Sequence, residues 1–172
     1  MYKWGIQMQL LAKWLGVVVA VSSLSAHALA ASLDLDGLTV GQPATPEAVL
    51  TSLGVTCGEG YQGTEVCNGN TSYEAHPAEA NVVIGADGVL DRILLTIDHD
   101  NYEDVIKALR KKFGPPRSSV HPVVQNGFGA RFQQEQLVWY GARGTQLFAS
   151  RYAADTNHAT ILLTTKRGRE DN

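Results

Sequence analysis

Apolar residues recur at helical spacing in the middle of the chain. Between residues 98 and 116 they lie three and four positions apart and form one apolar stripe of Tyr102, Val105, Ile106, Leu109 and Phe113. Asn101 is a favourable N-cap residue, and Gly114 followed by two prolines is a strong stop signal. We therefore predict a helix here, with basic residues crowded near its C-terminal end, where the helix dipole favours cations.

A second, shorter helix is predicted nearer the N-terminus. Thr45, Pro46 and Glu47 supply an N-cap, a proline at the first helical position and an acid in the first turn. The two helical segments share an order of cap, acid, valine, apolar pair and closing glycine. Two tandem halves, each a helix followed by strands, would explain this likeness, and so would the ordinary sequence rules of helices.

Alternation with a period of two predicts strands on both sides of the central helix. The expected strands are 33–40, 71–75, 80–85 and 89–98 before it, and 128–133, 136–142, 146–153 and 158–166 after it. Residues 58–69 and 117–127 are expected to be loops. These elements predict an α+β fold, with one or two helices packed on an antiparallel sheet of five to seven strands.

The N-terminal segment has the pattern of an export signal. Residues 14–26 form an uncharged apolar run, and two A-x-A patterns follow, ending at Ala28 and Ala30. The run is shorter than the roughly 20 apolar residues that a membrane span needs. We predict a signal peptide at 1–30, a single domain at 31–166 and a charged tail at 167–172. The protein is then periplasmic or secreted, with no stable membrane anchor after cleavage.

The two cysteines, Cys57 and Cys67, both belong to the predicted exported part. In an oxidising compartment this pattern predicts one disulfide that closes a short loop. Their spacing differs from the C-x-x-C pattern of redox enzymes, so the disulfide is expected to be structural.

Charge is divided unevenly along the chain. Residues 31–104 hold thirteen acidic residues and one basic residue, whereas residues 105–172 hold four acidic and eleven basic. Either the two halves pack together and partly neutralise each other, or an acidic face is offered to a basic protein partner. Export and an acidic mature chain argue against a nucleic-acid partner.

Three segments together resemble a known kind of protein. They are G-L-T-V-G-Q-x-A-T-P-E-A-V-L-x-x-L-G, then K-K-F-G-P-P after a strand hairpin, then V-W-Y. This combination resembles small bacterial periplasmic domains of the BamE-like and β-lactamase-inhibitor-protein-like kinds. The resemblance implies helices paired with an antiparallel sheet, and a bacterial envelope protein that binds another protein. It assigns no site residue, and the chain lacks the lipid-anchor cysteine of the BamE pattern.

The motifs that carry chemistry point away from catalysis. Residues 58–63 match G-x-G-x-x-G, but they follow a predicted helix and lie between the cysteines, so we expect a loop without a dinucleotide cofactor. Asp98, His99 and Asp100 are of metal-binding types, but neighbours at a strand end point in different directions, which favours a polar lead-in to the helix. The sequence has no G-x-S-x-G motif and no cysteine left for a Cys–His pair. We predict no catalytic, cofactor-binding or metal-binding residues.

Several residues are candidates for contact with a partner protein. Tyr61 and Glu65 lie in the predicted disulfide loop, which would lose little entropy on binding. Neighbouring Trp139 and Tyr140 point to opposite faces of a strand, so one is expected in the core and the other in an exposed aromatic patch with Phe148 or Tyr152. The candidate set is therefore Tyr61, Glu65, Trp139, Tyr140 and Tyr152.

The sequence thus favours a soluble periplasmic protein-binding module, acting as an inhibitor or as an envelope assembly partner. The alternative is a small envelope hydrolase or small-ligand carrier that uses the acidic N-terminal half, and would need two carboxylates in one cleft. A third class is a structural envelope protein that associates with itself.

Overall fold

The computed structural model describes residues 32–153 and 155–170. The predicted signal peptide at 1–30 lies outside this range. The helices are α1 (Pro46–Leu53), α2 (Tyr102–Phe113) and α3 (Arg167–Glu170), and single 3₁₀ turns occur at Tyr61–Gly63, His99–Asn101 and Ala142–Gly144. The strands are β1 (Asp34–Leu35), β2 (Leu38–Thr39), β3 (Thr56–Glu59), β4 (Glu65–Tyr73), β5 (His76–Ile84), β6 (Leu90–Asp98), β7 (Ser118–Val120), β8 (Val123–Gln125), β9 (Arg131–Gln133), β10 (Gln136–Tyr140), β11 (Gln146–Ser150) and β12 (His158–Thr164).

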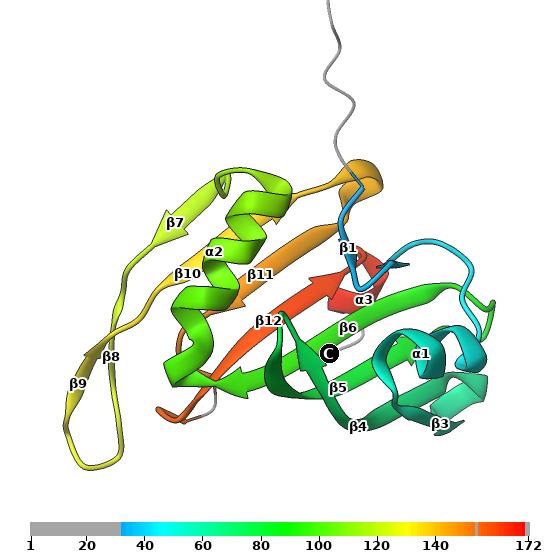
Figure 1. Cartoon of the computed structure of the whole chain (residues 1–172), viewed down its shortest axis with the longest axis horizontal. Coiled ribbons are helices and arrows are strands. Elements are labelled where there is room, and N and C mark those ends of the chain that lie inside the picture. The colour runs from blue at the N-terminus through cyan, green and yellow to red at the C-terminus, as the bar shows by residue number, and fades with distance from the viewer. Residues whose placement is uncertain (1–31, 154, 171–172) are drawn as a thin grey trace, which may run out of the picture.

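One antiparallel sheet of eight strands dominates the molecule (Figure 1). Its strand order is β3-β4-β5-β6-β12-β11-β10-β7, and two small sheets pair β1 with β2 and β8 with β9. In the N-terminal half α1 is followed by β3 to β6, and in the C-terminal half α2 is followed by β7, β10, β11 and β12. The halves join where β6 pairs with β12 along seven residues.

The predicted α+β class with five to seven strands is wrong. Strands hold 46% of the residues and helices 24%, and the main sheet alone has eight strands. The end of β3 and the start of β4 lie in residues 58–69, and β7 lies wholly in residues 117–127. We expected both ranges to be loops. These strands lie at or beside the sheet edges and carry polar side chains such as Asn68 and Ser119, so the apolar alternation that signals a strand is missing.

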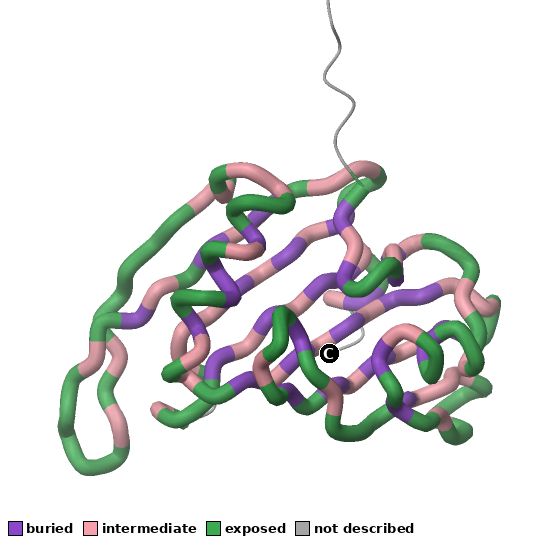
Figure 2. Tube along the Cα trace, viewed as in Figure 1, coloured by how far each residue is buried: buried purple, intermediate pink, exposed green. Residues whose placement is uncertain are grey.

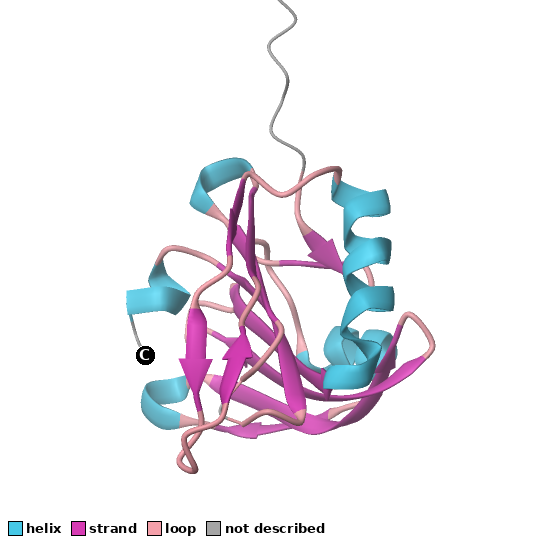
Figure 3. Ribbon diagram, turned by 90° about the vertical axis from the view of Figure 1, so that its left-hand side faces the viewer, coloured by secondary structure: helices cyan, strands magenta, loops and turns pink. Residues whose placement is uncertain are grey.

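Both longer helices lie on one face of the main sheet (Figure 3). The predicted stripe of α2 is buried at Tyr102, Val105, Ile106 and Leu109, with Phe113 half-buried. The side chains of β6 and β12 that face the helices are almost completely buried; these are Ile93, Leu95, Ile97, Ala159, Ile161 and Leu163. Figure 2 shows buried residues alternating with less buried ones along these central strands. The core therefore lies between the helices and the sheet, continuous across both halves.

The helix ends are set by local polar contacts. Thr45 caps α1, because its side chain accepts a hydrogen bond from the Ala48 amide at 3.3 Å. Asn101 occupies the predicted N-cap position of α2, but among the described contacts its side chain makes no capping hydrogen bond. Asp98 acts one turn earlier and accepts from the Asp100 amide at 2.8 Å, so the 3₁₀ turn leads directly into α2.

The opposite face of the main sheet, called the open face below, is turned away from α1 and α2. The short helix α3 lies on this side (Figure 3), although residues 167–172 were expected to be only a charged tail. Among the described residues, no helix is both long enough and apolar enough to span a membrane.

Candidate functional site

The register of the main sheet aligns outward side chains into rows across the open face. One row crosses seven strands, from β4 to β7, through directly paired residues: Asn68, Asn81, Leu94, Leu162, Phe148, Val138 and Ser118. Paired residues share a face, so these side chains are neighbours. The row is polar on β4 and β5 and apolar from β6 to β10, and these two stretches of the row are called the polar part and the apolar part of the open face.

A hairpin projects beyond the apolar part. β8 and β9 pair with each other outside the main sheet, and together with their turn they are called the arm, residues 123–133 (Figure 1). At its tip the Asn126 carboxamide oxygen accepts from the amides of Phe128 at 3.1 Å and Ala130 at 3.0 Å. Phe128 is 97% exposed at this tip. The turn thus holds a large apolar ring in water.

The base of the arm is clamped to the body of the protein. The buried Gln134 side chain donates to the Tyr152 carbonyl at 2.7 Å and accepts from the Tyr152 amide at 2.9 Å. The Tyr152 ring in turn lies edge-on to Phe132 of β9, with centroids 5.6 Å apart. These contacts fix the direction in which the arm leaves the sheet.

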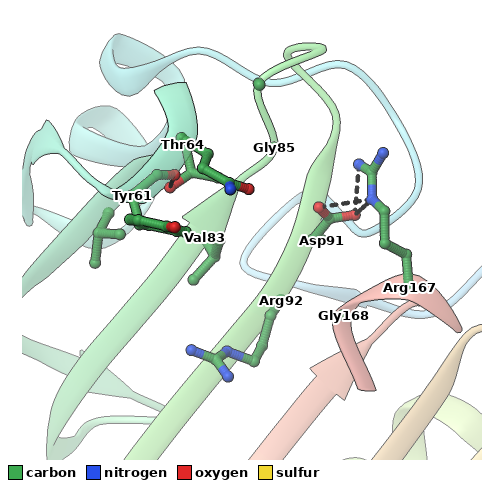
Figure 4. Close-up of a pocket in the computed structure, with 11 residues that line it drawn as sticks. Tyr61, Thr64, Val83, Gly85, Asp91, Arg92, Arg167 and Gly168 are labelled. Carbon is green, nitrogen blue, oxygen red and sulfur yellow. Dashed lines mark hydrogen bonds and ion pairs between the residues drawn. The ribbon is translucent and has the colours of Figure 1, made fainter. Parts of the chain in front are cut away.

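A hollow of about 630 Å³ opens at one end of the polar part of the open face. Its lining includes Tyr61, Val66, Val83, Arg92 and Arg167. Figure 4 shows Tyr61 on one side and Arg167 on the other, with Arg92 extending from β6.

Arg167 of α3 is held by two carboxylates beside this hollow. It donates to Asp87 at 2.7 Å and to Asp91 at 2.8 Å (the Asp91 bonds are dashed in Figure 4). The hydrogen bonds from Arg167 lower the pKa of Asp87 to about 2, and those two acids raise the pKa of Arg167. Gly85 makes room for the cluster, since a Cβ there would lie 2.7 Å from the Arg167 guanidinium. The cluster attaches the C-terminal helix to β6.

Two hairpin turns at this end of the sheet share the sequence G-x-x-G-T. They are residues 60–64, between β3 and β4, and residues 141–145, between β10 and β11. In each the threonine hydroxyl donates to a carbonyl three residues earlier at 2.8 Å, and the residue before the second glycine, Gln62 or Arg143, has positive φ. The G-x-G-x-x-G motif at 58–63 therefore forms the end of β3 and a turn into β4. A dinucleotide site requires a helix start at that point.

The structure separates the five candidate partner-binding residues. Tyr61 is 81% exposed at the first of these turns, and Glu65 is half-buried where β4 begins. Trp139 lies in the core, where its indole N–H donates to the Gly114 carbonyl at 2.9 Å, so Tyr140 is the exposed member of that pair. Tyr152 is half-buried at the base of the arm. Tyr61 and Tyr140 thus lie on different hairpins.

The predicted disulfide between Cys57 and Cys67 is confirmed. The two cysteines are directly paired on β3 and β4, so the bond ties the edge strand to its neighbour. A disulfide of this kind is compatible with an oxidising compartment.

Asp98, His99 and Asp100 lie closer together than the sequence led us to expect. Their possible ligand atoms are within 4.8 Å of one another, because residues 99–101 form a 3₁₀ turn rather than a straight strand end. Existing contacts account for this cluster: Asp98 accepts the Asp100 amide, and the His99 ring stacks on Tyr152 with centroids 5.5 Å apart. The arrangement is that of a polar lead-in to α2.

Sequence reasoning missed Phe128, Gln134 and Arg167. Phe128 lies in N-G-F-G, a turn signal between two short apolar runs, and this signal could have indicated a hairpin. The partners of Gln134 and Arg167 lie 18 and 76 to 80 residues away along the chain, and no local pattern indicates them.

Comparison with known protein families, with curated proteins and with solved structures finds no match for this chain.

Proposed function

We propose that the chain is an exported protein-binding module that engages another protein through the arm and the adjoining apolar part of the open face. The observation that carries this proposal is Phe128, which is 97% exposed at the tip of a clamped hairpin. Aromatic side chains that enter a partner's pocket dominate the energy of many interfaces. The backbone at Phe128 is already held by its hydrogen bond to Asn126, so docking orders less of the chain and costs less entropy.

The surface around the arm fits this role. Val120 and Val123 are 48% and 61% exposed, and Val138 and Phe148 lie in the outward row on the neighbouring strands. Together they supply an apolar patch with polar neighbours, the usual composition of an interface core and rim. The predicted signal peptide and the disulfide favour the periplasm or the exterior as the compartment.

The proposed role can be tested by capture from an envelope extract, with bound proteins identified by mass spectrometry. We expect Phe128→Ala to reduce recovery of a specific partner by about tenfold or more, as for an interface hot spot. The matched control is Leu50→Ala, which truncates a residue that is 49% exposed on α1, at the opposite face. Unchanged recovery with Phe128→Ala, and also with the arm shortened to a two-residue turn, would contradict the proposal.

A further variant separates the arm from the disulfide hairpin. Tyr61→Ala combined with Glu65→Lys alters the hairpin at the other end of the sheet. We expect this variant to retain the partner that Phe128→Ala loses. The reverse result would assign the interface to the disulfide hairpin.

The hydrolase alternative needs two carboxylates in one concave site, and Glu79 and Asp98 come nearest to it. Both residues line one hollow of about 250 Å³. They occupy diagonal positions on the paired strands β5 and β6, and residues at such positions are typically about 7–8 Å apart. Both side chains are exposed to water, whereas a general acid is normally held in an apolar pocket. This geometry does not favour the hydrolase alternative.

A further inference from the structure

The chain contains two Asn-Gly pairs, and the fold gives them different surroundings. One is Asn68-Gly69, inside β4, and the other is Asn126-Gly127, in the turn of the arm. In such a pair the glycine nitrogen can attack the carbonyl carbon of the asparagine side chain, because glycine has no Cβ to obstruct the approach. Whether this attack occurs depends on the freedom of that nitrogen and on the groups around the carboxamide.

The carboxamide oxygen of Asn126 is held between two main-chain donors. The amides of Phe128 and Ala130 donate to Oδ1 at 3.1 Å and 3.0 Å. These are the distances at which the donors of an oxyanion hole contact a developing negative charge. Attack on the side-chain carbonyl carbon moves negative charge onto Oδ1, so both hydrogen bonds strengthen as the reaction proceeds.

The nitrogen of Gly127 is available for this attack. The main-chain bonds of the turn run from the Asn126 amide to the Ala130 carbonyl at 3.0 Å, and from the Gly129 amide to the Asn126 carbonyl at 3.0 Å. Among the hydrogen bonds of the described residues, none uses the Gly127 amide. Gly127 is exposed, and a Cβ built on it would meet nothing within 4 Å. Water and hydroxide therefore reach this N–H directly.

Asn68 and Gly69 are held in an extended strand instead. At this point β4 is paired on both sides, with Thr56 of β3 and Asn81 of β5. The main chain must leave the extended conformation before the glycine nitrogen can close a ring with the side chain, and these pairings oppose that rotation. The Asn68 oxygen accepts from one donor, the Asn81 carboxamide at 2.6 Å. The strand therefore protects this Asn-Gly pair, and the turn of the arm does not protect the other.

We propose that Asn126 is a site of spontaneous deamidation, promoted by the turn that holds Phe128. Hydroxide removes the Gly127 amide proton, the nitrogen forms a bond to Cγ of Asn126, and the carbonyl electron pair moves to Oδ1. When the electron pair returns, the Cγ–Nδ2 bond breaks and ammonia leaves with a proton taken from water, which regenerates hydroxide. The product is a succinimide ring, and water opens it at either carbonyl to leave aspartate or isoaspartate.

The isoaspartate product alters the tip of the arm. Its main chain runs through the former side-chain carbons, so the chain is longer by a methylene group and Oδ1 becomes a main-chain carbonyl oxygen. This oxygen no longer meets the amides of Phe128 and Ala130 in the same geometry, and a free carboxylate is added beside the exposed ring. Deamidation is therefore a slow, irreversible change that loosens and charges the arm. The reaction itself does not rest on the proposed function.

The test follows both Asn-Gly pairs in the same chain. The mature protein is held at mildly alkaline pH, digested and analysed by mass spectrometry, with aspartate and isoaspartate distinguished by electron-transfer fragmentation. The reduced chain, unfolded in guanidinium chloride at the same pH, supplies the intrinsic rate of each pair. We expect similar rates at residues 68 and 126 in the unfolded chain. Folding should raise the rate at Asn126 by about tenfold, since its two donors remain exposed to water, and should lower the rate at Asn68.

Two variants separate the parts of this inference. Gly127→Ala should slow the loss of ammonia in both folded and unfolded chains, and its methyl group has room in the turn. Asn126→Asp adds the charge but keeps an acceptor for both amides, so hydrogen exchange at Phe128 and Ala130 should stay slow there and accelerate in the isoaspartate product. A folded rate at Asn126 that is no faster than its unfolded rate, or slower than that of Asn68, overturns the inference. Capture of a partner through Phe128 can succeed in either case, so this failure leaves the proposed function standing.

Discussion

The two halves of the sheet share one core and differ on the open face. In the N-terminal half β4, β5 and β6 are nine residues long, and their outward side chains include the amides of Asn68 and Asn81 and the charged groups of Glu79, Arg92 and Asp98. In the C-terminal half β10 and β11 are five residues long, and their outward side chains include Val138, Tyr140 and Phe148, with Leu162 of β12 beside them. The arm extends only this second half.

The difference shows which residues specify the architecture and which are available for recognition. Inward positions of both halves carry the same class of residue, because each must pack against a helix. Outward positions are not constrained by the core, so one half can present amides and charges while the other presents aromatic rings. We therefore expect changes at inward positions to affect both halves, and changes at outward positions to affect one.

The largest expected effect comes from the junction between the halves. Leu95 of β6 is paired with Ile161 of β12, and both are fully buried. Leu95→Ala should lower the free energy of unfolding by about 2–5 kcal/mol, the usual cost of such a cavity. Urea denaturation measures this value, and hydrogen exchange should accelerate equally in β5 and β11.

Leu94→Ala is the matched control on the same strand. Leu94 is half-buried on the open face, so its truncation should cost less than about 1 kcal/mol. Equal effects of the two substitutions would mean that the open face is as well packed as the core, and the comparison of faces would fail.

A smaller and more local effect is expected from the disulfide, which only the N-terminal half possesses. Cys57→Ala with Cys67→Ala opens the short covalent loop and should lower the free energy of unfolding by about 2–3 kcal/mol on the chain-entropy estimate. Amide protection should fall in β3 and the start of β4, and remain in β10 and β11. Protection lost to the same degree at both edges would show that the halves do not differ in local stability.

The parts of the fold that the sequence predicts are those with local signals. The apolar stripe of α2, the Thr45-Pro46 start of α1 and the turn at 86–88 each need only a few consecutive residues. The disulfide was predictable because the chain has only two cysteines. The strands β3 and β7 were missed because their polar residues gain order from a neighbouring strand rather than from their own pattern.

The candidate site shows the same limit. Tyr61 and Tyr140 were singled out and are exposed, but so was Trp139, whose indole lies in the core. Adjacent strand positions face opposite sides, and only the sheet order decides which side is inward. Phe128 was missed because it sat at the boundary between an expected loop and an expected strand, where no periodic pattern assigns a role.

The smallest expected effect concerns His158, the first residue of the strand that joins the halves. Its Nδ1 lies 2.9 Å from a carboxylate oxygen of Asp155, and this hydrogen bond raises the pKa of His158 and lowers the pKa of Asp155. The stabilisation from His158 is therefore fully present below its usual value of about 6.5 and is lost as pH rises through the higher folded value. The stabilisation from Asp155 is present above about pH 4 and is lost as pH falls through its lower folded value.

Asp155→Asn tests the pair directly. The substitution should lower the pKa of His158 in an NMR titration and reduce the loss of stability as pH rises above about 6.5. Both side chains are about half exposed, so the change in stability should be small. A His158 titration that the substitution leaves unchanged would assign its environment to the carboxylates Glu79 and Asp98, and would tie this histidine to the N-terminal half.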